Sequence, residues 1–214
     1  YIINGFKSVV FGAGMATHLI ISARTEGDQR SKSGITLFLV DIKSDGITLQ
    51  NYPTIDEYRA SEVVIENLTV SKENILGELG NSCEAIEEQV DLSTIAICSE
   101  AVGILQVLKD STNDYCKNRK QFGQSISANQ AIQHRLVDMM IEYEQAKSIL
   151  YMAITADLSN SDERRKAASA AKARIGKAIK FVGENAIELH GCLGVVDEYM
   201  ISHFFKSATL IGIL

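Results

Sequence analysis

The stretch Arg119-Lys120-Gln121-Phe122-Gly123, followed by Gln130 eleven residues after the arginine, separates two long helical patterns. Arginine presents a planar fork of donors that suits a phosphate group. A helix that begins just beyond the turn adds unpaired N–H groups and the positive end of its dipole. Because Phe122 adds a flat apolar face, these groups together suit a ligand that has phosphates and a ring. A surface arginine in an ordinary interhelical loop is an equally good interpretation of the residue types alone.

On both sides of this stretch the hydrophobic residues repeat with a helical period. The repeat begins after Gly80-Asn81-Ser82, where Ser82 is a plausible helix cap. Four segments show it, and they lie at about 83–117, from Ile132 to Leu150, from Ala171 to Leu189, and from about 198 onward. Ser159-Asn160-Ser161-Asp162 separates the second segment from the third. The pattern predicts an antiparallel four-helix bundle over residues 82–214.

Residues 1–81 have the pattern of β structure. Short runs rich in β-branched residues lie at 8–11, 19–23, 35–40 and 62–65. Turn signals separate the runs, among them Asn4-Gly5 and the polar segment from Glu26 to Gly34, which we expect to be an exposed hairpin tip. The spacing predicts an antiparallel β-sandwich or barrel-like sheet. The fold class is therefore α+β, with the β domain preceding the bundle.

The net charge of −6 argues against a general nucleic-acid-binding protein, which would carry a basic surface. The third helical segment does contain seven basic residues, and the simplest interpretation is a solvated face. These residues are Arg164, Arg165, Lys166, Lys172, Arg174, Lys177 and Lys180.

The cysteines are scattered, with no C-x-x-C pair and no histidine at metal-ligand spacing; they are Cys83, Cys98, Cys116 and Cys192. This usage indicates reduced thiols in a cytoplasmic setting and no metal site. Cys98 lies in an apolar helix and should belong to the core. We expect no membrane span and no signal peptide. The chain opens in a strand-like run and stops in an apolar one, so we expect a truncated fragment of a longer protein.

Several further motifs follow one another along the whole chain. They are Asn4-Gly5-Phe6-Lys7, Ala23-Arg24-Thr25, Tyr58-Arg59-Ala60-Ser61-Glu62-Val63, Val70-Ser71-Lys72-Glu73-Asn74-Ile75-Leu76-Gly77, Arg119-x-x-Phe122-Gly123 with Gln130, His190-Gly191-Cys192-Leu193-Gly194, and Asp197-Glu198-Tyr199. Each motif is weak alone, but the ordered set is specific. On the basis of this ordered set of motifs, the chain resembles the acyl-CoA dehydrogenase superfamily over essentially all of its length.

The resemblance implies FAD as cofactor and oxidation of the Cα–Cβ bond of an acyl-CoA thioester. In such enzymes a carboxylate removes the α proton while the β hydrogen leaves as hydride, and the cofactor serves as the electron acceptor. The resemblance also implies that the electrons pass to an electron-transferring flavoprotein. It further implies a homo- or hetero-tetramer that shares FAD across a subunit boundary.

The resemblance assigns cofactor contacts to two segments. Arg119, Phe122 and Gln130 would reach the FAD of a neighbouring subunit, with Gln121 at the pyrophosphate and Gly123 in the same turn. The Gly-rich turn before the last helix would lie along the FAD; its residues are Gly191, Cys192 and Gly194. A C-cap turn that only ends a helix is the other interpretation of the two glycines, and both can hold together.

At several matching positions this chain departs from the family. Val9 and Phe11 stand where the family has a Trp and a Thr that touch the flavin ring. Cys192 replaces a glycine, and Glu188 replaces a glutamine, which could bring a carboxylate near phosphate. Lys206-Ser207 replaces an Arg-Asp pair. These changes resemble the divergent subunits of heteromeric bacterial members, so a non-catalytic partner subunit that completes another chain's FAD site is the alternative.

The catalytic carboxylate has no obvious candidate within the chain. The resemblance implies that it lies beyond Leu214 or, in a minority of members, on the first helix near Ser93. Glu100 lies two turns after Ser93, and its sequence neighbours are apolar. Such surroundings would raise its pKa and make it a candidate base. A glutamate that points to solvent is the favoured interpretation.

Overall fold

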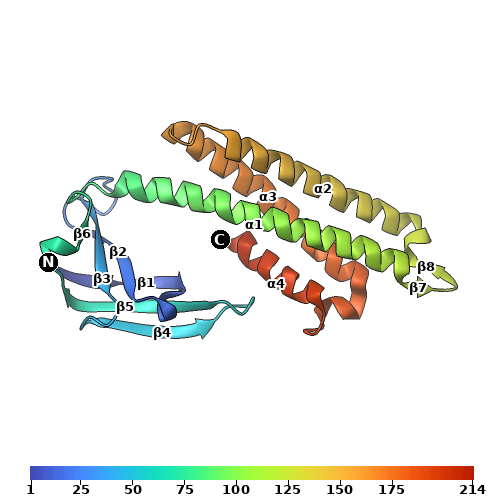
Figure 1. Ribbon diagram of the computed structural model, residues 1–214, viewed down its shortest axis with the longest axis horizontal. Coiled ribbons are helices and arrows are strands. Elements are labelled where there is room, and N and C mark those ends of the chain that lie inside the picture. The colour runs from blue at the N-terminus through green and yellow to red at the C-terminus, as the bar shows by residue number, and fades with distance from the viewer. The chain divides into compact units, whose positions relative to one another are not determined.

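The computed structural model describes all 214 residues. Its contacts divide the chain into two compact units, Tyr1–Glu88 and Gln89–Leu214. The first unit consists mostly of strands and the second mostly of helices, as the blue-to-red path of Figure 1 shows. Each unit has its own hydrophobic core.

Two three-stranded antiparallel sheets form the first unit. One sheet has the order β1 (Ile2–Phe11), β5 (Arg59–Thr69), β4 (Ile47–Pro53), and the other has the order β2 (His18–Arg24), β3 (Ile35–Asp41), β6 (Ile75–Leu76). Side chains of both sheets share one core, in which Phe38 of β3 and Val63 and Ile65 of β5 are almost fully buried. The predicted antiparallel sandwich is therefore confirmed.

Strand β1 is longer than the sequence indicated, because Asn4-Gly5 lies inside it and forms no turn. The β1–β5 register shifts between Ile3 and Gly5, and the Asn4 Oδ1 accepts a hydrogen bond of 2.7 Å from the Asn67 amide. Asn-Gly here accompanies an irregularity within a strand, which sequence alone does not distinguish from a hairpin turn. Strand β4 was not predicted from the sequence, because its polar residues and terminal Pro53 weaken the strand signal.

The segment between β2 and β3 is the exposed hairpin tip that the sequence predicted. The Arg24 guanidinium lies inside this loop and donates to four of its carbonyls. Nη1 bonds the oxygens of Glu26 and Ser33 at 3.4 and 3.1 Å, and Nη2 bonds those of Gln29 and Ser31 at 3.2 and 3.0 Å. The loop is therefore closed by a side chain from the strand that precedes it.

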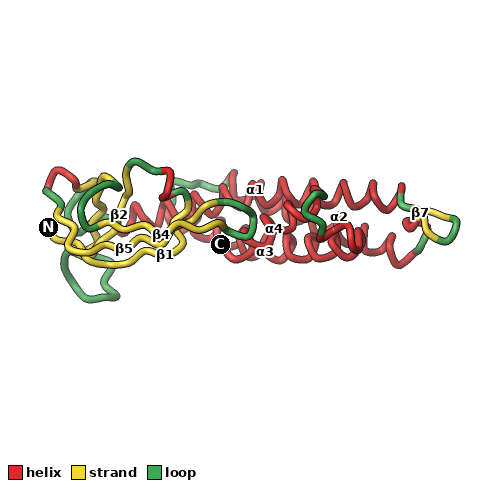
Figure 2. The backbone as a smooth tube through the Cα atoms, turned by 90° about the horizontal axis from the view of Figure 1, so that it is seen from below, coloured by secondary structure: helices red, strands yellow, loops and turns green.

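Four helices form the second unit and run alongside one another in Figure 2. They are α1 (Cys83–Asn118), α2 (Gln130–Thr155), α3 (Ser161–His190) and α4 (Met200–Ile213). Buried alanines on α2 and α3 let the two helices pack closely; they include Ala146, Ala153, Ala171, Ala178 and Ala186. The predicted bundle is confirmed, and the side chain of Asn160 caps α3 at the predicted break by accepting from the Asp162 and Glu163 amides.

The basic residues of α3 do not form a uniformly solvated face, which corrects the sequence interpretation. Arg164 is buried, pairs with Asp91 of α1 at 3.3 Å and donates to the Leu158 carbonyl at 3.0 Å. The Lys172 ammonium donates to the Ile211 carbonyl near the end of α4 at 2.7 Å. Arg174 pairs with Glu142 of α2 at 2.6 Å. These basic side chains therefore join helices.

By length and composition alone, α1 is apolar enough to cross a membrane, contrary to the sequence expectation that no segment is. A core helix of a packed bundle passes the same test. Cys98, Leu105 and Leu108 of α1 lie in the bundle core, and the same helix carries Asp91 in its ion pair. The buried position of Cys98 confirms its predicted core role.

Candidate functional site

The motif that begins at Arg119 folds as a two-residue β-hairpin between α1 and α2. Its strands are β7 (Lys120–Gln121) and β8 (Gln124–Ser125). Phe122 and Gly123 form the turn with φ of 51° and 83°, two successive positive values typical of a type I′ hairpin turn. Phe122 is fully exposed at the tip. An aromatic side chain held in solvent by a tight turn is available to a surface outside the chain.

The polar groups of this junction have no partners within the chain. Arg119, Gln121 and Gln130 are exposed, and their side chains form no hydrogen bond or ion pair. Asn129 immediately precedes α2 and makes no side-chain cap bond, so the first-turn N–H groups of α2 lack that acceptor. The junction therefore offers a guanidinium, two amides and a helix N-terminus to an external group.

The turn that follows α3 contains two glycines with different structural roles. Gly191 has φ 61° and ψ −136° and donates its amide to the Glu188 and Ile187 carbonyls, so the C-cap interpretation is confirmed for it. A Cβ on Gly191 would meet nothing within 4 Å, whereas a Cβ on Gly194 would lie 2.9 Å from the Ile187 carbonyl oxygen. Gly194 is thus required by packing, and the backbone at Gly191 is open. Cys192 between them is exposed.

Contacts between helices bring this turn and the hairpin to the same end of the bundle (Figure 1). The Tyr115 ring in the last turns of α1 stacks on His190 at 4.3 Å between centroids. Arg135 near the start of α2 forms an ion pair with Glu188 near the end of α3. This pairing compensates the Glu188 carboxylate, whose charge the sequence had suggested could oppose a phosphate nearby.

His190 is a buried residue that the sequence analysis did not single out. Its Nδ1 lies 2.8 Å from the Ala186 carbonyl, which fixes the hydrogen on Nδ1, while the buried Nε2 has no hydrogen-bond partner. The Tyr199 ring is tilted by 54° against the His190 ring, with 5.4 Å between the two centroids. Burial lowers the pKa of His190, so the ring is neutral at pH 7. Tyr115 is 75 residues from His190 in the sequence, so no local sequence signal marks this aromatic cluster.

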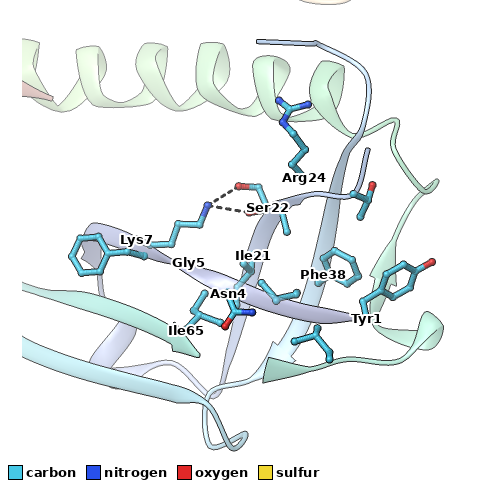
Figure 3. A pocket seen from close by; sticks show the side chains of 14 residues that line it. Tyr1, Asn4, Gly5, Lys7, Ile21, Ser22, Arg24, Phe38 and Ile65 are labelled. Atoms are coloured by element: carbon cyan, nitrogen blue, oxygen red, sulfur yellow. Dashed lines mark hydrogen bonds between the residues drawn. The ribbon is translucent and has the colours of Figure 1, made fainter. Parts of the chain in front are cut away.

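A cavity of about 570 Å³ lies in the first unit between the unpaired edges of β1 and β2. Figure 3 shows Lys7 directed at Ser22, and its Nζ donates to the Ser22 carbonyl at 3.0 Å and to Oγ at 3.1 Å. Phe38 and Ile65 contribute apolar surface. Since Lys7 is paired and Arg24 is held in its own loop, the cleft offers strand edges and apolar surface in place of a free cation.

Residues 83–214 match the sequence model of a known family, described as the C-terminal domain of acyl-CoA dehydrogenase. This chain belongs to the acyl-CoA dehydrogenase family.

Similar proteins match over both units of this acyl-CoA dehydrogenase family member. A 3-(aryl)acrylate reductase of Clostridium sporogenes is 30% identical over 100% of the chain and 57% of its own length. The caffeyl-CoA reductase-Etf complex subunit CarC of Acetobacterium woodii is 28% identical over 100% of the chain and 56% of its own length. The structure of a glutaryl-coenzyme A dehydrogenase glutaryl-CoA complex superposes with a TM-score of 0.89 at 26% identity, covering 98% of this chain and 54% of that one. The chain thus spans a little over half of these relatives.

In this family member, Glu100 does not lie in the apolar surroundings that the sequence suggested. Its side chain is exposed, because it lies off the α1 face that buries Cys98, Ala101 and Leu105. Ser93 is exposed as well and accepts a hydrogen bond from Gln89 at 3.0 Å. The structure therefore gives no support to a desolvated base at Glu100, and the solvent-facing interpretation holds.

Proposed function

We propose that this chain is part of an FAD-dependent acyl-CoA dehydrogenase that oxidises the Cα–Cβ bond of an acyl-CoA thioester and passes the electrons to an electron-transferring flavoprotein. Membership of the family supports the oxidoreductase class. The observation that carries the proposal is the set of unpartnered polar groups at one end of the bundle, namely Arg119, Gln121 and Gln130 with the N-terminus of α2.

These residues fit FAD by their chemistry. The guanidinium of Arg119 and the N-terminus of α2 can hold a pyrophosphate, with Gln121 and Gln130 as additional hydrogen-bonding groups. The exposed Phe122 ring offers an apolar face. The open backbone at Gly191 leaves room for a dinucleotide to pass close to the main chain. When bound, FAD supplies the acceptor for the hydride that leaves the β carbon.

We infer that these groups serve an FAD bound mainly by a neighbouring subunit. Their lack of partners within the chain supports this, since a junction that served its own chain would be expected to satisfy its polar groups internally. The assembly would be a homo- or hetero-tetramer. From the resemblance to the family, we place the base that removes the α proton beyond Leu214; within the chain, Glu100 is exposed and Ser93 has no carboxylate.

The choice of substrate and electron partner rests on the relatives. The two proteins from Clostridium sporogenes and Acetobacterium woodii are named as reductases, and the second is named as part of a complex with Etf. Reduction of an unsaturated Cα–Cβ bond is the reverse of the proposed oxidation. We therefore propose an acyl-CoA or its α,β-unsaturated form as the substrate and Etf as the electron partner.

The proposal is tested with the full-length protein that contains this chain. The purified protein should be yellow, and its flavin absorbance near neutral pH should bleach when an acyl-CoA is added without oxygen. Reoxidation should follow when an electron-transferring flavoprotein is supplied. A protein that remains colourless after incubation with FAD would overturn the proposal.

A non-catalytic partner subunit is the second candidate. The feature that favours it is the set of departures from the family pattern at Glu188, Cys192 and Lys206-Ser207. This candidate predicts no turnover by the purified homomer and recovery of turnover on mixing with a catalytic subunit of the same family. Normal turnover by the homomer alone would eliminate it.

A further inference from the structure

An aromatic contact joins the end of helix α1 to the end of helix α3. The Tyr115 ring stacks on the His190 ring with 4.3 Å between the centroids and 26° between the planes. The Tyr115 hydroxyl also donates to the His190 carbonyl at 3.5 Å. Because the two residues are 75 positions apart in the chain, the contact brings together two segments that are distant in the sequence.

Each ring of this stack lies next to one of the two segments that are proposed to contact FAD. On α1, the Tyr115 carbonyl accepts a hydrogen bond of 2.8 Å from the Arg119 amide, so about one helical turn separates the ring from Arg119. On α3, His190 directly precedes Gly191, whose backbone is open. A displacement of either ring would therefore move Arg119 relative to Gly191.

The His190 ring is fixed by its own helix and by the turn that follows it. Its Nδ1 donates to the Ala186 carbonyl at 2.8 Å. A Cβ on Gly194 would lie 3.3 Å from the His190 Cβ, so the turn packs directly on this residue. The buried Nε2 has no hydrogen-bond partner, which costs free energy. What the imidazole contributes here is therefore its flat face and its fixed position.

A second contact between these segments is the ion pair of Arg135, near the start of α2, with Glu188, near the end of α3. Both residues are exposed. Exposed ion pairs contribute little to stability, because water and salt screen them. The stack, in which His190 is buried, is therefore the firmer of the two links.

We propose that Tyr115 and His190 are positioning residues that fix the spacing between Arg119 and the open backbone at Gly191, so that both segments engage one dinucleotide at the same time. This inference rests on the proposed function, in which both segments contact FAD. Neither ring needs to touch the cofactor. The stack acts through preorganisation, because a site whose parts are already spaced for the ligand loses less conformational freedom on binding.

The test uses the full-length protein and measures the FAD dissociation constant and, in the cofactor-free protein, hydrogen exchange at the amides of residues 119–126. Tyr115→Leu and His190→Leu remove the stack but keep apolar bulk, and each should weaken FAD binding about tenfold. Exchange at these amides should accelerate in both variants. Tyr115→Phe and His190→Phe keep two aromatic rings in contact, so each should stay within about twofold of the wild-type affinity.

Tyr143→Leu is the matched control, since Tyr143 is a buried tyrosine of α2 that lies about 20 Å along the helix from Gln130. This variant should lose stability in urea and keep the wild-type FAD affinity. Equal losses of affinity in Tyr143→Leu and Tyr115→Leu would overturn the inference, as would unchanged affinity in both leucine variants of the stack. A wild-type protein that takes up no FAD would overturn the proposed function and the inference with it.

Discussion

Arg24 in the β unit and Arg119 in the bundle are both exposed arginines beside a hairpin, and they differ in whether the chain satisfies their donors. Arg24 donates to four carbonyls of its own loop. Arg119 has no partner in the chain, and the hairpin after it exposes Phe122 completely. The comparison shows that residue type and exposure do not identify a binding arginine. The distinguishing feature is whether the chain already satisfies its donors.

Arg164 is a buried arginine whose partners all lie within the chain. Its replacement should therefore cause the largest loss of stability. Its side chain is buried between Asp91 and the Leu158 carbonyl. Arg164→Ala leaves the Asp91 carboxylate buried without its cation, so we expect a loss of about 3–5 kcal/mol in unfolding free energy. Urea denaturation measures it, with the exposed Lys177→Ala as control. A loss equal to that of the control would contradict the account.

Arg24→Ala should have an intermediate effect that is confined to its loop. The loss of four hydrogen bonds from an exposed guanidinium should cost about 1–2 kcal/mol, less than their sum because water replaces the donors. Hydrogen exchange should accelerate at the amides of residues 25–34 and remain unchanged in the bundle. FAD affinity should not change, and a tenfold loss of that affinity would remove the contrast with Arg119.

His190 should make the stability of the protein depend on pH. Burial lowers its folded-state pKa, so the unfolded state binds more protons below the ordinary histidine pKa of about 6.5. The unfolding free energy should therefore fall as pH drops from 7 through 6.5 toward the folded pKa. The slope from this group is at most about 1.4 kcal/mol per pH unit.

Denaturation at pH 7.0 and 5.5 measures that slope in the wild type and in His190→Phe. Phenylalanine keeps a ring in contact with Tyr115 and Tyr199 but cannot titrate. The variant should show the smaller loss of stability on acidification, and the remaining histidines contribute equally to both proteins. Identical slopes would show that burial of His190 does not oppose its protonation.

Arg119→Ala should have the smallest effect on stability, below about 0.5 kcal/mol, which is usual for a surface change away from structural contacts. The reason is that its guanidinium has no partner within the chain. Thermal unfolding of the cofactor-free protein measures this effect directly. A loss as large as that of Arg24→Ala would mean that Arg119 serves the fold.

The helical half was the more predictable from sequence. Its long apolar repeats and the Asn160 cap follow from local patterns, and α1 begins at Cys83 as expected. Ser82 was expected to cap that helix, yet its hydroxyl accepts from the Leu37 amide in β3 at 3.2 Å. The strand half was less predictable, because pairing between distant strands decides whether Asn4-Gly5 is a turn or an irregularity.

The candidate site was predictable only in part. The Arg119 motif indicated a phosphate and a ring, but the absence of partners for Arg119 is a property of the folded chain. Glu100 was considered as a base because its sequence neighbours are apolar, but its side chain is exposed, in agreement with the favoured solvent-facing interpretation. The buried position of His190 depends on contacts between helices, to which a single sequence gives no direct access.

The most direct test of the account is the FAD content of the full-length oligomer carrying both Arg119→Ala and Gln130→Ala. Because these two side chains are proposed to hold a cofactor shared across a subunit boundary, the account predicts loss of most bound flavin while the helical circular dichroism is retained. Full flavin occupancy and wild-type affinity in the folded double variant would contradict it.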